Sequence, residues 1–241
     1  MAEPDRSFDR LAVHFDRFAE LAGGPLNAYL ESVLPDQGGR AIDLGCGTGR
    51  HAAMLASRYR QVLAVDVSAP MLQLAQARRA LPNITYQHRD LTSVTPDTDT
   101  TFDLILCAYA LHHVADLAQT LHGIRGLCAP GGRVVLIDNV ADHPSVPRQW
   151  FVTQAIATLA GDVLRRRRPL AQAWELFRLN TDPAWLDHLT SDRFLSRDQF
   201  ARAYASAFPN ARFTDLYRAR AVCWDAWDAP VPLRRPQPSS Q

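Results

Sequence analysis

A glycine-rich turn and the acidic residue after the next strand are the residues best suited to binding a nucleotide-like ligand. The run 41–50 (Ala-Ile-Asp-Leu-Gly-Cys-Gly-Thr-Gly-Arg) begins as an apolar strand and turns on three glycines before a helical pattern over 51–59. Glycine has no Cβ, so such a turn brings backbone N–H groups close to a ligand at a helix N-terminus. The next predicted strand, 61–65, is followed by Asp66, about 20 residues beyond the turn. A carboxylate there can accept hydrogen bonds from both ribose hydroxyls of an adenosyl ligand.

The turn is compatible with two kinds of nucleotide ligand, a dinucleotide or an adenosyl compound with an ammonium group. The dinucleotide pattern G-x-G-x-x-G has a third glycine where this chain has Arg50. Asp43 precedes the turn by two residues, where it would repel a diphosphate but suit a ligand with an ammonium group. The string Asp-Leu-Gly-Cys-Gly-Thr-Gly, with Asp66 in place, resembles the first motif of class I S-adenosylmethionine (SAM)-dependent methyltransferases. The resemblance is to the small-molecule enzymes of type 11 or 25, and it covers residues 40–139 well.

The resemblance implies a set of cofactor contacts and S-adenosylhomocysteine (SAH) as the product. Asp66 would bind the ribose, Asp90 and Leu91 would receive the adenine, and the residues after the strand 102–108 would flank the methionine part. The full expected set is Asp43, Gly45, Cys46, Gly47, Gly49, Asp66, Val67, Met71, Asp90, Leu91, Ala108 and Tyr109.

Two consecutive histidines, His112 and His113, are the candidates for a catalytic base. They follow the central strand 102–108, next to the expected position of the methyl group, and histidine titrates near neutral pH. Side chains of adjacent residues point apart, so we expect at most one to face the pocket. A capping or solvated role remains open for each, and Asp138 and His143 are weaker candidates.

The composition limits the other kinds of chemistry. The chain has 241 residues with 47% hydrophobic content, enough for one α/β domain with an insertion. Its net charge is +1 and its 26 basic residues are all arginine, so lysine has no catalytic role. The four cysteines show no metal-ligand spacing, so we expect no metal. Without a leader-like N-terminus or a long apolar run, we expect a cytoplasmic protein with no membrane contact.

The elements that must position these residues predict a Rossmann-like α/β fold. We expect a seven-stranded sheet with the last strand antiparallel, helices on both faces, an N-terminal helical cap and a helical insertion after the fifth strand. Ser7 is the expected N-cap of a helix over 7–22, and 92–101 reads as a loop. The expected divisions are a cap (1–38), a SAM-binding core (39–141), a helical lid (142–195), the end of the core sheet (196–228) and a disordered tail (229–241).

The lid and the cap supply the expected walls of the pocket. In the family, insertions at this place bind substrate, and here four aromatic residues are candidates: Trp150, Phe151, Trp174 and Phe177. His14, Phe15 and Arg17 could line the entrance. The run 165–168 is four arginines, which could bind phosphates, but no aromatic residues alternate with it, so we expect a dispensable, solvated helix end.

The sequence therefore predicts a SAM-dependent methyltransferase for a small, partly apolar or aromatic molecule in secondary-metabolite biosynthesis. One alternative is a SAM-binding member of the fold that catalyses a cyclisation or rearrangement without methylation. A binding module without turnover and a nucleic-acid methyltransferase are further alternatives, although we expect no nucleic-acid partner. The sequence leaves open whether the protein is a monomer or a homodimer.

Overall fold

A computed structural model describes residues 7–96, 98–141 and 146–226 of the chain. The proposed tail 229–241 and the candidate base His143 lie outside the described residues.

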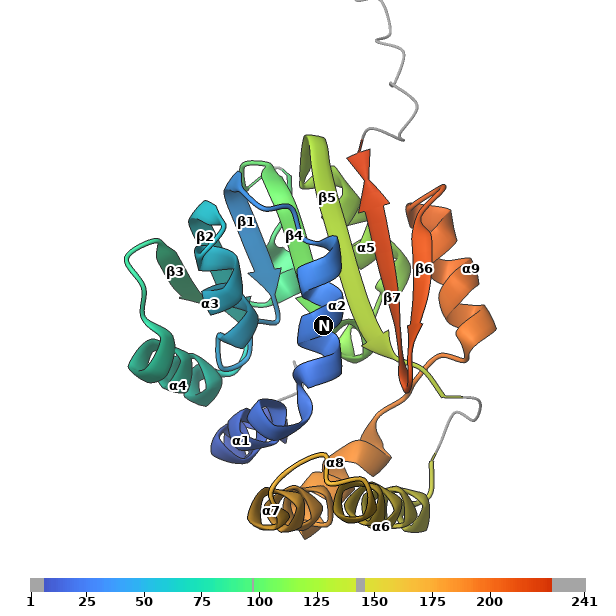
Figure 1. The fold of residues 1–241 in the computed structure, drawn as a ribbon. Helices are drawn as coiled ribbons and strands as arrows, with labels where there is room; N and C mark the ends of the chain where they lie inside the picture. Colours follow the sequence, from blue (N-terminus) through green and yellow to red (C-terminus); the bar gives the residue numbers. More distant parts are fainter. Residues whose placement is uncertain (1–6, 97, 142–145, 227–241) are drawn as a thin grey trace, which may run out of the picture.

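A seven-stranded sheet forms the centre of the molecule (Figure 1). Its strand order is β3-β2-β1-β4-β5-β7-β6. The first five strands in the chain are parallel, whereas β7 pairs antiparallel with both β5 and β6, which confirms the predicted fold class. The strands are β1 (Gly38–Leu44), β2 (Tyr59–Asp66), β3 (Ile84–His88), β4 (Phe102–Ala108), β5 (Cys128–Asn139), β6 (Arg212–Leu216) and β7 (Ala219–Asp225).

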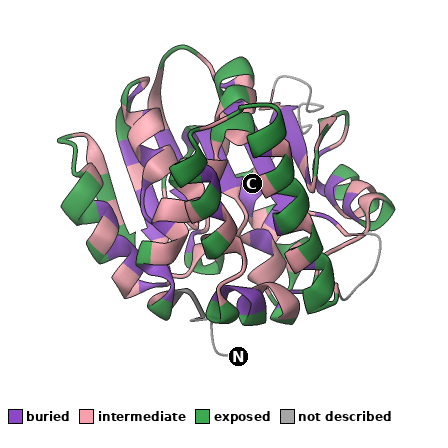
Figure 2. Cartoon of the chain, turned by 60° about the horizontal axis from the view of Figure 1, so that its bottom comes forward, coloured by how far each residue is buried: buried purple, intermediate pink, exposed green. Residues whose placement is uncertain are grey.

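Helices cover both faces of the sheet because its central strands are apolar on both sides. In β4, for example, Leu104 and Leu106 belong to one core cluster, and Ile105 and Cys107 to the other. Figure 2 shows the buried strands lying between helices whose outer faces are exposed. One face is packed by α2 (Gly24–Val33), α3 (Arg50–Ala56) and α4 (Ala69–Arg79), and the other by α5 (Leu117–Gly126) and α9 (Arg197–Ala207).

A third group of helices lies beyond the carboxyl ends of the parallel strands, below the sheet in Figure 1. The group consists of α1 (Ala12–Ala22), α6 (Arg148–Leu164), α7 (Leu170–Asn180) and α8 (Pro183–Ser191). The segment containing α6 to α8 leaves the sheet after β5 and returns before α9. Its two ends meet where the Ala141 N–H donates to the Leu195 carbonyl oxygen at 3.0 Å.

The N-terminal helix differs from the prediction at its start. A 3-10 turn, η1 (Ser7–Arg10), comes first, and α1 begins at Ala12 after Leu11, so Ser7 is not its N-cap. The Asp9 carboxylate in this turn accepts a hydrogen bond of 2.6 Å from the Ser68 hydroxyl, which fixes the turn against the start of α4. Among the described helices, none combines the length and the apolar character needed to cross a membrane.

Candidate active site

The glycine turn after β1 is built on left-handed backbone conformations. Gly45, Gly47 and Gly49 have φ angles of 70°, 51° and 76°, which side chains with a Cβ rarely adopt. A Cβ on Gly45 would lie 2.4 Å from the Cβ of Ala110, so this glycine also permits close packing against the residues after β4. The turn thus presents backbone at the carboxyl edge of the sheet, where α/β folds bind ligands.

Asp66, at the end of β2, is fixed by that turn. One carboxylate oxygen accepts from the Gly47 N–H at 2.7 Å and the other accepts from the Ser68 N–H at 2.8 Å. Burial raises the pKa of Asp66, and the backbone hydrogen bonds oppose this shift by stabilising the charged form. The carboxylate is therefore held in one orientation beside the glycine turn.

A cavity of about 1440 Å³ opens at this edge of the sheet. It exceeds the roughly 300–1,000 Å³ of a typical small-ligand site, so it can hold two molecules side by side. Its wall includes ten of the twelve residues predicted to contact the cofactor, namely Gly45, Cys46, Gly47, Asp66, Val67, Met71, Asp90, Leu91, Ala108 and Tyr109.

The other two predicted cofactor residues, Asp43 and Gly49, are not among the described residues that line the cavity. Asp43 is 1% exposed. Burial, with a further contribution from the Asp66 carboxylate, raises the pKa of Asp43 to about 7. The structure therefore places this carboxyl group behind the turn, as a buried group of the core.

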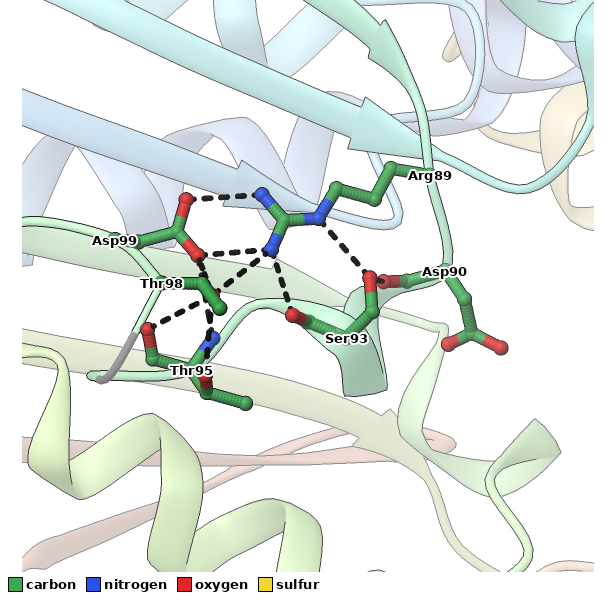
Figure 3. A network of polar contacts seen from close by, with 6 residues as sticks. All are labelled: Arg89, Asp90, Ser93, Thr95, Thr98 and Asp99. Carbon is green, nitrogen blue, oxygen red and sulfur yellow. Dashed lines mark hydrogen bonds and ion pairs between the residues drawn. The ribbon is translucent and has the colours of Figure 1, made fainter.

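The loop after β3 is held by an arginine (Figure 3). The Arg89 guanidinium makes two hydrogen bonds to the Asp99 carboxylate, at 2.9 and 2.8 Å, and a third to the Ser93 carbonyl oxygen. The neighbouring Asp90 carboxylate accepts from the Thr92 N–H at 2.8 Å and so begins a 3-10 turn, η2 (Leu91–Ser93). These contacts fix the loop that contributes Asp90 and Leu91 to the wall of the cavity.

His112 is oriented by a carboxylate on the next strand. Its Nδ1 lies 2.6 Å from an oxygen of Asp138, and the two side chains are 7% and 5% exposed. Its Nε2 lies 3.7 Å from Asp192, which also lies 3.7 Å from Nε2 of His188 on α8. Asp138, a weak candidate base in the sequence, is thus the partner of His112.

Both histidines line the cavity, whereas we expected at most one to face it. They lie in a tight 3-10 turn, η3 (Leu111–His113), which brings the two rings to a centroid distance of 3.9 Å. His112, His113 and Asp192 offer nitrogen and oxygen atoms that lie within 4.8 Å of one another, a set that could hold a metal ion. Cysteine spacing could not reveal this set, because it contains no cysteine and its aspartate is remote in sequence.

The four aromatic residues predicted to bind substrate are not among the described residues that line the cavity. Trp174 is 55% exposed and stacks on Phe177, while Phe151 is buried against Trp150. Their placement therefore does not support direct contact with substrate. The segment contributes other residues to the wall, namely Thr158, Arg168, Leu176, Asn180, Trp185, His188, Leu189 and Asp192.

Helix α1 closes the cofactor side of the cavity. Phe15 and Phe18 line the cavity, whereas Arg17 makes ion pairs with Glu20 and with Glu175 of α7. His14 packs against Trp185, with ring centroids 5.4 Å apart. Of the three residues expected at the entrance, Phe15 is therefore the one that the structure places in the wall.

A buried aspartate joins α1 to the glycine turn. Asp16 is 2% exposed and accepts a hydrogen bond of 2.7 Å from the Thr48 hydroxyl. Its carboxylate also pairs with Arg78 and Arg79 of α4, at 2.5 and 2.8 Å. Three elements that are separate in sequence thus meet at one carboxylate.

The four-arginine run is not uniform. Arg165, Arg166 and Arg167 are exposed after the end of α6, as expected. Arg168 instead turns inward, pairs with the buried Asp162 at 2.7 Å and donates to the Leu21 carbonyl oxygen at 2.8 Å. This arginine therefore connects the helical segment to the end of α1.

Comparison with known proteins extends these observations. A family model described as a methyltransferase domain matches residues 42–136. An uncharacterized methyltransferase of Mycobacterium bovis is 36% identical over 133 residues, which cover 54% of this chain and 66% of that protein, just under two thirds. A 2-phytyl-1,4-naphtoquinone methyltransferase of Thermosynechococcus vestitus is 30% identical over 167 residues, which cover 64% of this chain and 73% of that protein.

The fold is also found among solved structures. A methyltransferase from Haloferax volcanii, solved in complex with an activator protein, superimposes with a TM-score of 0.61. The match covers 94% of this chain and 99% of that one, at 15% sequence identity, so it bears on the fold alone.

Proposed function

Because the chain belongs to the class I SAM-dependent methyltransferases, we propose that it methylates a small, partly apolar or aromatic acceptor in secondary-metabolite biosynthesis. The observation that carries the proposal is that one cavity is lined both by the glycine turn and by His112, the partner of Asp138. The cofactor and an acceptor can therefore lie in contact without an intervening wall.

The residues of the cofactor half fit SAM. Val67, Met71 and Leu91 provide apolar contacts for an adenine ring, and Asp66 provides a fixed acceptor for the ribose hydroxyls. Gly45 and Gly47 permit close approach of the methionine part. SAM, when bound, supplies a methyl group on a positively charged sulfur. The protein supplies position and a site shielded from water, which account for much of the rate of such a displacement.

The His112–Asp138 pair supports a role in proton removal. If His112 donates its Nδ1–H to Asp138, its Nε2 carries the lone pair and can take a proton from an acceptor hydroxyl or acidic carbon. The Asp192 carboxylate, 3.7 Å from Nε2, would stabilise the imidazolium that forms. We therefore propose His112 as the base and Asp138 as the residue that positions it.

The aromatic character of the acceptor is supported by one relative. The Thermosynechococcus vestitus protein is named for a phytyl naphthoquinone, which is both aromatic and apolar. The cavity here has phenyl and indole rings in its wall, from Phe15, Phe18 and Trp185. Such rings exclude water from the cavity.

Incubation of the purified protein with SAM and a panel of phenols, enols and amines tests the proposal. We expect one class of acceptor to gain the mass of one methylene unit, with an equal amount of SAH released. An acceptor that rearranges without gaining mass would instead support the cyclisation alternative. Retained SAM without turnover over a broad panel would favour a binding module. Methylation of RNA or DNA, with binding that weakens in salt, would contradict a small-molecule acceptor.

A further inference from the structure

Arg218 occupies the acceptor side of the cavity. It lies in the two-residue turn between β6 and β7, and its carbonyl oxygen accepts from the Val140 N–H at 2.9 Å. Because β7 runs antiparallel to β5, this turn is held at the carboxyl end of β5, and Arg218 lines the cavity there.

The guanidinium group of Arg218 is held by aromatic rings. Its central carbon lies 4.5 Å from the centroid of Trp150 and 5.1 Å from that of Phe151, both at the start of α6. An arginine placed over aromatic faces keeps its N–H groups available in the guanidinium plane. These two aromatic residues, predicted to bind substrate, thus support a cavity residue.

This cation has no carboxylate partner among the described residues. Burial lowers the pKa of Arg218, and no carboxylate is among the groups that counter this effect. Arg168, in the same cavity, is by contrast paired with Asp162. Withdrawing a cation from water is unfavourable unless it gains hydrogen bonds and a counter-charge, and a ligand can supply both.

Tyr109 adds a neutral donor to the same region. It lines the cavity, and burial raises the pKa of its phenol to about 12, so the hydroxyl stays protonated. A guanidinium fork beside a phenolic O–H is the donor set for an oxyanion, and the planar fork matches a carboxylate in two parallel hydrogen bonds.

From this arrangement we infer that the acceptor carries a carboxylate, which Arg218 binds. The inference rests on the proposed methyl transfer and adds a substrate class to it. β4 and β5 lie between β7 and the glycine turn after β1, so the backbone at Arg218 and the glycine turn are three strand spacings apart, about 14 Å.

Binding of benzoate and of the neutral benzamide to the SAH-saturated protein, measured by calorimetry, tests the inference. We expect benzoate to bind more tightly than benzamide. Arg218→Gln should weaken benzoate binding by about tenfold to a hundredfold, as when a charge-assisted hydrogen bond is lost. Arg218→Lys should retain part of the affinity. Phenyl phosphate, tested in parallel, distinguishes a carboxylate site from a phosphate site, and its tighter binding would overturn the carboxylate assignment.

Arg220→Gln is the matched control. Arg220 lies on β7, two residues after Arg218, and its guanidinium lies over Phe213 at 5.2 Å. Unlike Arg218, it is 3.5 Å from a carboxylate, that of Asp215, and it is not among the residues that line the cavity. Benzoate binding should be unchanged in this variant, and SAM affinity should be unchanged in both. Equal binding of benzoate and benzamide, or full benzoate affinity in Arg218→Gln, would overturn the inference.

The two proposals fail separately. Benzoate binding that depends on Arg218, in a protein that methylates no acceptor, would support the anion site and contradict the proposed activity. Methylation that is equally efficient with and without Arg218 would support the activity and overturn the anion site.

Discussion

Nδ1 of His112 lies 2.6 Å from the Asp138 carboxylate, in a contact between the turn after β4 and the end of β5. Both side chains are almost fully buried, and His112 lines the cavity. An imidazole held in this way has one tautomer favoured, which leaves Nε2 as the proton acceptor.

Removal of either member of this pair should slow turnover. His112→Ala should lower kcat by about 10²–10⁴ if proton removal is part of the slow step. Asp138→Asn should also lower kcat, because the amide favours the His112 tautomer whose Nε2 carries the proton and cannot accept another. SAM affinity, measured by calorimetry, should not change in either variant. Full activity in both His112→Ala and His113→Ala would show that positioning alone drives the reaction, and loss of activity on chelation would indicate a metal ion instead.

Asp66→Ala should weaken SAM binding by about 1–3 kcal/mol, because the ribose hydroxyls would lose a charged acceptor. The carboxylate is already fixed by the Gly47 and Ser68 N–H groups, so little ordering is needed on binding. Titration calorimetry with SAM and with SAH measures the loss. An unchanged affinity would remove the ribose assignment.

Asp16→Asn should reduce the free energy of unfolding by about 1–3 kcal/mol, since a buried carboxylate loses its charge opposite Arg78 and Arg79. SAM affinity should also fall, because Thr48 in the glycine turn loses a charged partner. Urea denaturation and calorimetry measure the two effects. Glu20→Gln, at an exposed ion pair of the same helix, should change stability by less than about 0.5 kcal/mol.

The pH dependence of stability should report on Asp43. Its pKa is about 7 in the fold, against about 3.9 for an unfolded chain. A raised pKa means that protonated Asp43 favours the fold, so its contribution is full at low pH and is lost as the pH rises through about 7. The Tm of the protein without SAM should therefore fall between about pH 4 and pH 7, and Asp43→Asn should flatten that slope. An identical slope in the variant would contradict a buried, protonated Asp43.

The arginine run should divide into two groups. Replacing Arg165, Arg166 and Arg167 together by glutamine should leave turnover intact and change stability by less than about 0.5 kcal/mol, since all three are exposed. Arg168→Gln should lower the free energy of unfolding by about 1–3 kcal/mol, because the buried Asp162 loses its partner. Thermal unfolding of the two variants tests the division, and equal effects would contradict it.

The parts of the site that could be predicted lie in continuous stretches of sequence. The strand 102–108 follows from an apolar run, and the turn after β1 follows from its three glycines, the residues that adopt positive φ most readily. Asp66 follows from its distance to that turn in the sequence. Asp16, Asp192 and Arg218 act on residues far away in sequence, so no local pattern marks them. The sequence predicts that at most one of His112 and His113 faces the cavity, whereas a 3-10 turn brings both rings to the same side.

The backbone contact between Ala141 and Leu195 has a consequence for how this protein can change. The segment that it closes leaves the sheet and returns to it at two points that are one hydrogen bond apart. Such a segment can be lengthened, shortened or exchanged between homologous enzymes without altering strand order or register. Changes of length within this segment therefore need not move the strands that carry the glycine turn and the His112–Asp138 pair.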